Sequence, residues 1–327
     1  MILVTGGAGF IGSNLVAALA ERGTRVVVSD WLGHDERWRN LAKHAVHDLV
    51  APEALLGWLE RHGPKLEALV HLGAVTRTDE TDVDLIVTRN VRASLDLLEW
   101  CTGAQVPFLY ASSAATYGDG AQGFEDDPAP QALAALRPRN AYGWSKHLVD
   151  RRIAGMAARD ERRPPQWVGL KFFNVYGPNE YHKGSMQSVV ARSFAGLHSG
   201  GPLRLFRSAR PDYRDGEQMR DFVYVRDCVD LMLWLLAHRE VSGLFNVGTG
   251  RARTWKALGA AMFKALDRPE AIEWIDLPAS LAAQYQYFTE ARMERLRQAG
   301  YRAPFASLEE GVGDYVKNYL LTADPYR

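Results

Sequence analysis

Short apolar runs separated by longer amphipathic stretches dominate the first half of the chain. The runs have strand length and are rich in Val, Ile, Leu and Phe, and they predict strands at Ile2–Val4, Val26–Ser29, Ala68–Leu72, Phe108–Ala111 and Val168–Phe172. Between them, helical periodicity predicts helices that include Pro52–Arg61, Val83–Cys101 and Tyr142–Ala158. Strands that alternate with helices favour a Rossmann-type α/β fold with a doubly wound parallel sheet. Ligands of such sheets bind beyond the carboxyl ends of the strands.

The pattern changes after Asn174. Glycine and proline interrupt residues 177–211, and the later strand-like runs are isolated, at Leu203–Phe206, Phe222–Val225, Phe245–Val247 and Ile272–Asp276. We therefore expect two domains, residues 1–175 and a smaller C-terminal α/β lobe of residues 176–327. The last runs are expected to return to the sheet or to complete the lobe, so the chain is expected to cross over between the two parts.

The first apolar run leads directly into a glycine-rich turn. Gly6, Gly9 and Gly12 are spaced three apart, and residues 13–21 have a helical pattern. Such glycines permit a tight turn and let backbone N–H groups at a helix N-terminus approach a pyrophosphate. The second strand ends at Asp30, about 20 residues further on, where a carboxylate can bind the adenosine ribose. The ordered set predicts a dinucleotide-binding domain.

A second pattern indicates proton transfer. Tyr142 and Lys146 are four residues apart in a predicted helix, so their side chains share one face. A nearby ammonium favours the phenolate of a tyrosine, whose ordinary pKa is about 10. Beside a hydride acceptor, such a pair can move a proton. Ser113, more than its neighbour Ser112, is placed after a strand to hydrogen-bond the reacting substrate oxygen.

Composition excludes several classes of protein. In the 327 residues, 39 Lys and Arg balance 39 Asp and Glu, so no nucleic-acid partner is expected. The two cysteines lie in apolar helical patterns, which fits buried thiols in a reducing compartment, and no Cys/His spacing predicts a metal site. The first strand begins at residue 2, leaving no room for a signal peptide, and no apolar stretch is long enough to span a membrane. We expect a cytoplasmic protein without a membrane partner.

Four segments together resemble a known family. Gly6-Gly7-x-Gly9-x-x-Gly12, Ser113, Tyr142-x-x-x-Lys146 and Arg220-Asp221-Phe222-x-Tyr224-Val225 are similar to the extended short-chain dehydrogenase/reductases that act on nucleotide sugars. The resemblance covers essentially the whole chain and implies that the C-terminal lobe binds the sugar nucleotide. Dehydratases of this family have an Asp-Glu pair directly after the hydroxyl residue. This chain has Ala114 and Ala115 there, which cannot transfer protons, so we expect an epimerase.

Longer segments are similar to the branch of this family that inverts C6 of an ADP-linked heptose. They are Phe108–Gly118, Phe173–Pro178, His182–Met186 and Tyr285–Thr289. The resemblance implies transient oxidation, hydride return and a role in lipopolysaccharide core heptose synthesis, with Tyr142 and Lys183 as two acid/bases. A second acid/base has a chemical reason, because a base on one face can serve only one of two epimers. A UDP-sugar 4-epimerase or a nucleotide-sugar reductase of the same family is the alternative.

The resemblance also implies which residues contact the ligands. The catalytic residues are Tyr142, Lys183, Lys146 and Ser113. Cofactor contacts are expected at Gly6, Gly9, Phe10, Ile11, Gly12, Asp30, Trp31, Arg37, Leu72, Gly73, Ala74, Asn90, Tyr142, Lys146 and Val175. Substrate contacts are expected at Ser113, Asn174, Lys183, Ser185, Arg192, Phe206, Arg220 and Tyr285. A homo-oligomer that recycles a tightly bound NADP is implied. NAD stays open, because Asp30 favours an unphosphorylated ribose whereas Arg37 can meet a 2′-phosphate.

The chain departs from the family at several positions. Arg192 stands where a histidine is common, and Trp31 stands where an asparagine usually follows the strand-end acid. Residues 206–209 are Phe-Arg-Ser-Ala in place of Phe-Glu-Gly-Ser, and the segment 208–219 is longer than expected. The segment 208–219 borders the expected diphosphate site, so nucleotide or sugar preference can differ from that of the family.

Overall fold

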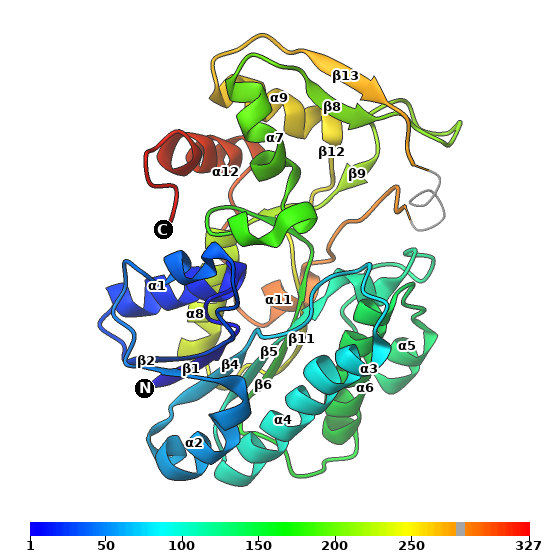
Figure 1. The fold of residues 1–327 in the computed structure, drawn as a ribbon. Coiled ribbons are helices and arrows are strands. Elements are labelled where there is room, and N and C mark those ends of the chain that lie inside the picture. The colour runs from blue at the N-terminus through cyan, green and yellow to red at the C-terminus, as the bar shows by residue number, and fades with distance from the viewer. Residues whose placement is uncertain (279–284) are drawn as a thin grey trace.

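A seven-stranded parallel sheet forms the centre of the lower part of the molecule in Figure 1. The computed structural model describes residues 1–278 and 285–327. The strands, in the order β11-β6-β5-β4-β1-β2-β3, pair only in parallel. They are β1 Ile2–Thr5, β2 Val26–Ser29, β3 Asp48–Val50, β4 Ala68–His71, β5 Phe108–Ser113, β6 Trp167–Phe172 and β11 Gly243–Val247. The predicted Rossmann-type fold is confirmed.

Helices cover both faces of this sheet because its central strands are apolar on both sides. Helices α1 (Phe10–Glu21) and α8 (Val225–Ala237) pack together on one face (Figure 1). The other face is covered by α2 Leu55–His62, α4 Ala93–Ala104 and α6 Ala141–Ala158. Two short helical segments, α3 (Val83–Ile86) and the π-helical turn η4 (Val87–Arg92), lead into α4. Helix α5 (Pro130–Ala135) packs against α6.

A smaller lobe lies above the carboxyl edge of the sheet (Figure 1). It contains the parallel pair β8 (Leu203–Phe206) and β13 (Ile272–Ile275), and the antiparallel pair β9 (Met219–Arg220) and β12 (Arg253–Thr254). Its helices are α7 Val189–His198, α9 Trp255–Ala265 and α12 Leu308–Tyr315. These elements bury an apolar cluster of their own, whose largest members include Leu203, Leu258, Met262, Phe263, Val312 and Tyr315.

The chain passes between the sheet and the lobe several times. After β6, the chain forms β7 (Asn174–Tyr176), which pairs in parallel with β10 (Phe222–Tyr224). After β10, α8 returns to the sheet and β11 adds to its edge beside β6, before α9 enters the lobe again. Helix α11 (Glu294–Gln298) contacts β11. Residues after 176 therefore contribute to both parts of the molecule.

Both cysteines lie in the interior, as their apolar sequence context predicts. Cys101 and Cys228 are buried and free. Across residues 1–278 and 285–327, no helix is long and apolar enough to cross a bilayer, and no group of His, Cys, Asp and Glu could hold a metal ion.

Candidate active site

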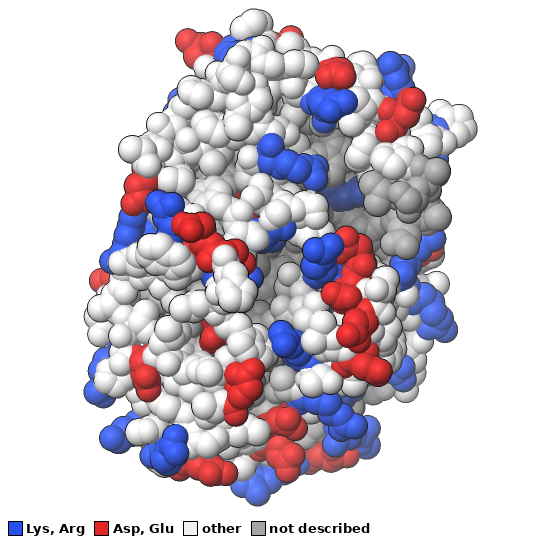
Figure 2. Space-filling view, in the orientation of Figure 1, with Lys and Arg blue, Asp and Glu red and all other residues white. Residues whose placement is uncertain are grey.

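A cavity of about 1040 Å³ opens where the carboxyl edge of the sheet meets the lobe. Its walls come from the segments that directly follow β1, β2, β4, β5 and β6, together with η6 (Tyr181–Met186) and the start of α7. This is the edge at which doubly wound sheets bind ligands. In Figure 2 this face is hollowed between the lower part and the lobe, with acidic and basic side chains interspersed along it.

The glycine turn after β1 is shaped for close approach of a ligand to the backbone. Gly6 has φ +65°, which favours glycine, and a Cβ on Gly12 would lie 2.1 Å from the Gly6 carbonyl oxygen. Gly9 is the N-cap of α1, and no side chain caps that helix end. The first N–H groups of α1 are therefore available to an anion, and the helix dipole favours it. The turn fits the pyrophosphate of a dinucleotide.

Asp30, directly after β2, lies over this turn. Its carboxylate accepts hydrogen bonds from the Ala8 N–H (2.9 Å) and the Trp31 N–H (2.8 Å). Burial raises the pKa of Asp30, and these N–H groups lower it. The indole N–H of Trp31 donates to Glu53 (2.6 Å). An acidic group thus borders the expected ribose position, as the glycine-strand-acid pattern predicts.

Two arginines lie near Asp30. Arg37 makes a two-pronged ion pair with Asp35, with N···O distances of 2.7 and 2.9 Å, and it also lines the cavity. The Arg89 guanidinium is 4.1 Å from the centroid of the Trp31 ring and lines the same cavity. The ribose end of the site therefore holds both carboxylates and guanidinium groups.

The start of α6 brings Tyr142 beside Ser113. Asn140 caps the helix by accepting a hydrogen bond from the Gly143 N–H at 2.7 Å. A Cβ on Gly143 would lie 2.7 Å from the Ala115 carbonyl oxygen, so only glycine lets the helix approach the turn after β5 this closely. The Ser113 hydroxyl then lies near the Tyr142 hydroxyl. Burial raises the pKa of Tyr142, and the hydrogen bond with Ser113 opposes this shift.

Lys146 lies one helical turn beyond Tyr142 and is only 3% exposed. Burial lowers its pKa to about 8, and the negative charge of Asp150 opposes that shift. Lys146 therefore stays mostly cationic at neutral pH. A buried cation on the same helix face as the tyrosine is the arrangement expected for a proton-transfer pair.

Asp150 is the centre of a buried polar cluster behind Tyr142. Its carboxylate accepts hydrogen bonds from Lys171 (2.6 Å), Ser112 (2.7 Å) and Tyr110 (3.0 Å). Because the Ser112 hydroxyl donates to Asp150, Ser113 is the hydroxyl of the serine pair that is available to a substrate.

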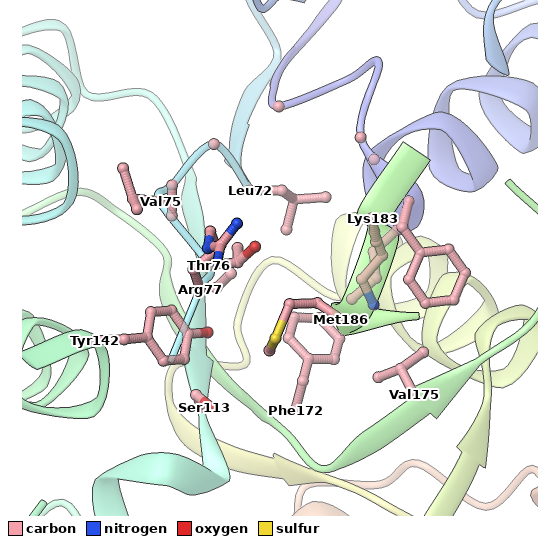
Figure 3. Close-up of a pocket in the computed structure, with 18 of the residues that line it drawn as sticks. Leu72, Val75, Thr76, Arg77, Ser113, Tyr142, Phe172, Val175, Lys183 and Met186 are labelled. Carbon is pink, nitrogen blue, oxygen red and sulfur yellow. The ribbon is translucent and has the colours of Figure 1, made fainter. Parts of the chain in front are cut away.

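Lys183 enters the cavity from the side opposite to Tyr142. Figure 3 shows the two side chains pointing toward the same space, Tyr142 from α6 and Lys183 from η6. The Lys183 ammonium is 4.8 Å from the centroid of the Phe10 ring. Burial lowers the pKa of Lys183, and Glu180 raises it. Two groups able to transfer protons thus face each other across one cavity.

Most of the residues predicted for the site line this cavity. They are Gly6, Gly9, Phe10, Ile11, Gly12, Asp30, Trp31, Arg37, Leu72, Gly73, Ala74, Ser113, Tyr142, Lys146, Asn174, Val175, Lys183 and Arg192. Asn90 lies behind the wall, where its side-chain amide bonds to both backbone groups of Val75 and to Ser145. Asn90 therefore positions the turn after β4 through Val75. Ser185 is exposed on η6, and its carbonyl accepts a hydrogen bond from Arg192 at 3.3 Å.

Phe206, Arg220 and Tyr285 form a second group in the lobe. The Phe206 and Tyr285 rings meet edge to face at 6.3 Å, and the Arg220 guanidinium is 5.3 Å from the Tyr285 centroid. Arg220 is also 5.9 Å from the ring of Trp255, which lines the cavity. Arg220 is only 7% exposed and forms no ion pair within the described part of the chain. An anionic ligand can supply its counter-charge.

Several cavity residues were not predicted from the sequence. They are Thr76, Arg77, Arg89, Phe172, Met186 and Trp255, among others. Thr76 and Arg77 follow β4 closely, so their position after a strand was the available signal. Arg89 and Trp255 lie on helices, and nothing local distinguishes them from surface residues.

The family model of the NAD dependent epimerase/dehydratase family matches residues 2–248. The chain belongs to this family, and with the glycine turn and Asp30 in place it has the site for a nicotinamide cofactor. An ADP-L-glycero-D-manno-heptose-6-epimerase of Nitratidesulfovibrio vulgaris (strain DP4) is 49% identical over the full length of both chains.

Solved structures show the same relationship. The structure of the Helicobacter pylori ADP-L-glycero-D-manno-heptose-6-epimerase superposes with a TM-score of 0.78 at 30% identity, covering 97% of this chain and 95% of that one. A Thermus thermophilus UDP-glucose 4-epimerase in complex with NAD superposes with a TM-score of 0.72 at 26% identity, covering 95% of this chain and 96% of that one. The chain is thus similar over nearly its whole length to two kinds of epimerase.

Proposed function

We propose that this protein inverts C6 of ADP-D-glycero-D-manno-heptose to give the L-glycero epimer. The observation that supports this activity best is the placement of Tyr142 and Lys183 on opposite sides of one cavity. An epimerase that oxidises a carbinol and then reduces it from the other face needs an acid/base at each of two oxygen positions. The 49% identity to a protein named for this reaction supports the same substrate.

In the proposed reaction, Tyr142 as phenolate takes the proton of the C6 hydroxyl while Ser113 donates a hydrogen bond to the same oxygen. Lys146 stabilises the phenolate electrostatically. Hydride leaves C6, and a ketone is formed. Rotation of the side chain then turns the ketone oxygen toward Lys183, which donates a proton as hydride returns to the opposite face. The hydride that leaves C6 is replaced by the hydride that returns, so the substrate undergoes no net oxidation. One proton is gained by Tyr142 and one is lost by Lys183.

The bound nicotinamide supplies the hydride acceptor and donor in this scheme. Gly6, Gly9 and Gly12 would hold its pyrophosphate, and Asp30 its adenosine ribose. We propose NADP as the bound form, because the guanidinium groups of Arg37 and Arg89 border the ribose position and can pair with a 2′-phosphate.

The lobe would bind the ADP part of the substrate. Arg220 is a buried guanidinium without a carboxylate partner in the described residues, and it suits a diphosphate. Phe206 and Tyr285 supply apolar ring surfaces beside it. By the same similarity we propose a cytoplasmic homo-oligomer that makes heptose for the lipopolysaccharide core.

The decisive experiment uses purified protein with its own bound cofactor. Mass spectrometry of the released cofactor should detect NADP, and detection of NAD alone would contradict that part of the proposal. The protein should convert ADP-D-glycero-D-manno-heptose to its epimer without added cofactor. Folded, cofactor-loaded protein that leaves this substrate unchanged would exclude the assignment. Conversion of UDP-glucose to its C4 epimer, or net consumption of NAD(P)H, would identify the alternative 4-epimerase or reductase.

A further inference from the structure

A buried carboxylate lies behind Lys183. Glu180 is fully buried, and its Oε2 is 4.0 Å from the Lys183 ammonium. The Glu180 carboxylate also accepts hydrogen bonds from the hydroxyl (2.6 Å) and the backbone N–H of Ser188, and from the Gly177 N–H (3.3 Å). Burial raises the pKa of Glu180, whereas these three donors and Lys183 lower it and hold the carboxylate at a defined place.

The backbone before Glu180 is fixed from several directions. Asn179 has φ +72°, a left-handed conformation that asparagine adopts more readily than most other non-glycine residues. Its side chain donates to the Ser13 hydroxyl of α1 at 3.0 Å, and its carbonyl accepts from Asn40 at 3.2 Å. The Asn40 amide also donates to the Ala8 carbonyl in the glycine turn at 2.8 Å. The turn that presents Glu180 is thus tied to the dinucleotide site.

Glu180 supplies the negative charge next to Lys183. Near this pair, His182 on η6 and Arg37 on η1 (Glu36–Asn40) are cationic when ionised, and Arg192 on α7 lines the same cavity. Two further titratable groups, the phenols of Tyr181 on η6 and Tyr315 on α12, lie near Glu180. Asp35, the other nearby carboxylate, is bound by Arg37. From α1, the apolar ring of Phe10 faces the ammonium.

From this geometry we infer that Glu180 is a positioning residue that holds Lys183 toward the cavity and keeps it protonated in the resting enzyme. The inference rests on the proposed two-base reaction. That reaction needs one group as base and the other as acid at its start. Lys146 places a cation beside Tyr142, and Glu180 places an anion beside Lys183. The two partners therefore favour opposite protonation states across one cavity. After each turnover, Tyr142 releases its proton to solvent and Lys183 takes up a proton from solvent.

The test compares the unchanged protein with Glu180→Gln, both loaded with cofactor. Removal of the carboxylate lowers the pKa of Lys183, so Lys183 loses its proton at lower pH. The alkaline limb of kcat/KM against pH is therefore expected to move down by about 1 pH unit or more. The acid limb should stay in place. An alkaline limb at the same pH in Glu180→Gln would overturn the inference.

A second measurement needs no substrate. Trace acetylation of the cofactor-loaded protein over a range of pH, followed by mass spectrometry of the Lys183 peptide, reports the fraction of neutral amine. The midpoint should fall in Glu180→Gln, and it should fall by a smaller amount in Glu180→Asp, whose carboxylate is kept but lies further from Lys183. An unchanged midpoint would overturn the inference even if the substrate assignment failed. Conversely, a shifted midpoint without heptose conversion would refute the substrate and leave the role of Glu180 intact.

Ser188→Ala is the matched control. It removes one hydroxyl donor to Glu180 and the N-cap of α7 but keeps the carboxylate. A purely structural role of Glu180 predicts equal shifts of the midpoint and of the alkaline limb in Ser188→Ala and Glu180→Gln. Our inference predicts a clearly smaller shift in Ser188→Ala. Circular dichroism and cofactor content show whether each variant is folded. If Glu180→Gln does not fold, Glu180→Asp replaces it, because the shorter side chain draws the carboxylate back from Lys183. A lower midpoint of Lys183 acetylation in Glu180→Asp supports the inference, and an unchanged midpoint overturns it.

Discussion

Asp150 and Lys171 form an ion pair in which both side chains are fully inaccessible to solvent. Burying two charges costs several kcal/mol of desolvation, which is offset only if the remaining polar atoms also find partners. Here Asp150 accepts from Ser112 and Tyr110, and Lys171 donates to Thr116 at 2.8 Å. The cluster therefore maintains the packing behind Tyr142, and the charge of Asp150 also acts on Lys146 in the cavity wall.

Replacing Lys171 by Met should leave the Asp150 carboxylate buried without its counter-charge. We expect the free energy of unfolding to fall by about 3–5 kcal/mol, measured by urea denaturation. The double variant Asp150→Asn, Lys171→Met should lose less than Lys171→Met alone, because no isolated charge is left. A double variant as unstable as the single one would show that packing, not charge, determines the loss.

Local sequence identified the residues of the proton-transfer pair but not their electrostatic partners. Tyr142 and Lys146 are four apart in one helix, so their spacing alone predicts a shared face. Glu180 and Lys183 are three residues apart, and no helix was predicted there. In the structure Glu180 is the N-cap of the 3₁₀ helix η6, in which residues three apart lie on the same side. The role of Glu180 became visible only with its burial and its 4.0 Å distance to Lys183.

Among the secondary-structure elements, α6 determines the geometry of the site most directly. Its N-cap, Asn140, ends the preceding loop two residues before Tyr142, and its first turn packs on the turn after β5. The helix then continues to Ala158, so that Tyr142, Lys146 and Asp150 follow one another at intervals of one turn. An error in the start of α6 would displace all three side chains.

Asn140→Ala should remove the cap and expose the Gly143 N–H. We expect a loss of about 1 kcal/mol in unfolding free energy. A lower kcat is also expected, because the first turn presents Tyr142. Asn140→Asp is the control, since aspartate caps helices equally well. Equal stability and kcat in the Ala and Asp variants would contradict a role for the cap.

Every strand of four or more residues was predicted, whereas of the shorter strands only β10 was predicted. Strands β1 and β2 agree with the expected runs to within one residue, because their side chains are buried on both faces of the sheet. Strands β3 and β7 have three residues each. Such short strands exist because a neighbouring strand pairs with them, and their own sequence contains no detectable period.

At the scale of the whole molecule, different parts are expected to bind the two ends of the proposed substrate, the sheet edge its reacting carbon and the lobe its diphosphate. The sheet edge holds Tyr142 and the glycine turn, and the lobe holds Arg220 and its aromatic neighbours. Arg220 also donates to the carbonyls of Met219 (2.8 Å) and Gln286, so its guanidinium is held in place before a ligand arrives. Changes in the lobe are therefore expected to affect mainly KM, and changes at the sheet edge mainly kcat.

Arg220→Met should weaken substrate binding while cofactor content stays unchanged. Loss of charge-assisted hydrogen bonds to the diphosphate is expected to raise KM by about 10–100-fold. A smaller effect on kcat is expected, because the reacting atoms lie elsewhere. Arg207→Met is the matched control, because Arg207 is exposed and pairs with Asp215 and Asp276. A similar KM in both variants would place the diphosphate away from Arg220.

The sequence by itself determined the parallel sheet, the glycine turn with Asp30, and the Tyr142–Lys146 pair. Each depends on residues close in the chain, where strand length, helical spacing and glycine content act directly on the backbone. Only the tertiary structure decided that Lys183 faces Tyr142 across the cavity, that Glu180 lies buried behind it, and that β11 returns to the sheet beside β6. These arrangements join segments far apart in the chain, and they depend on how the sheet and the lobe pack together.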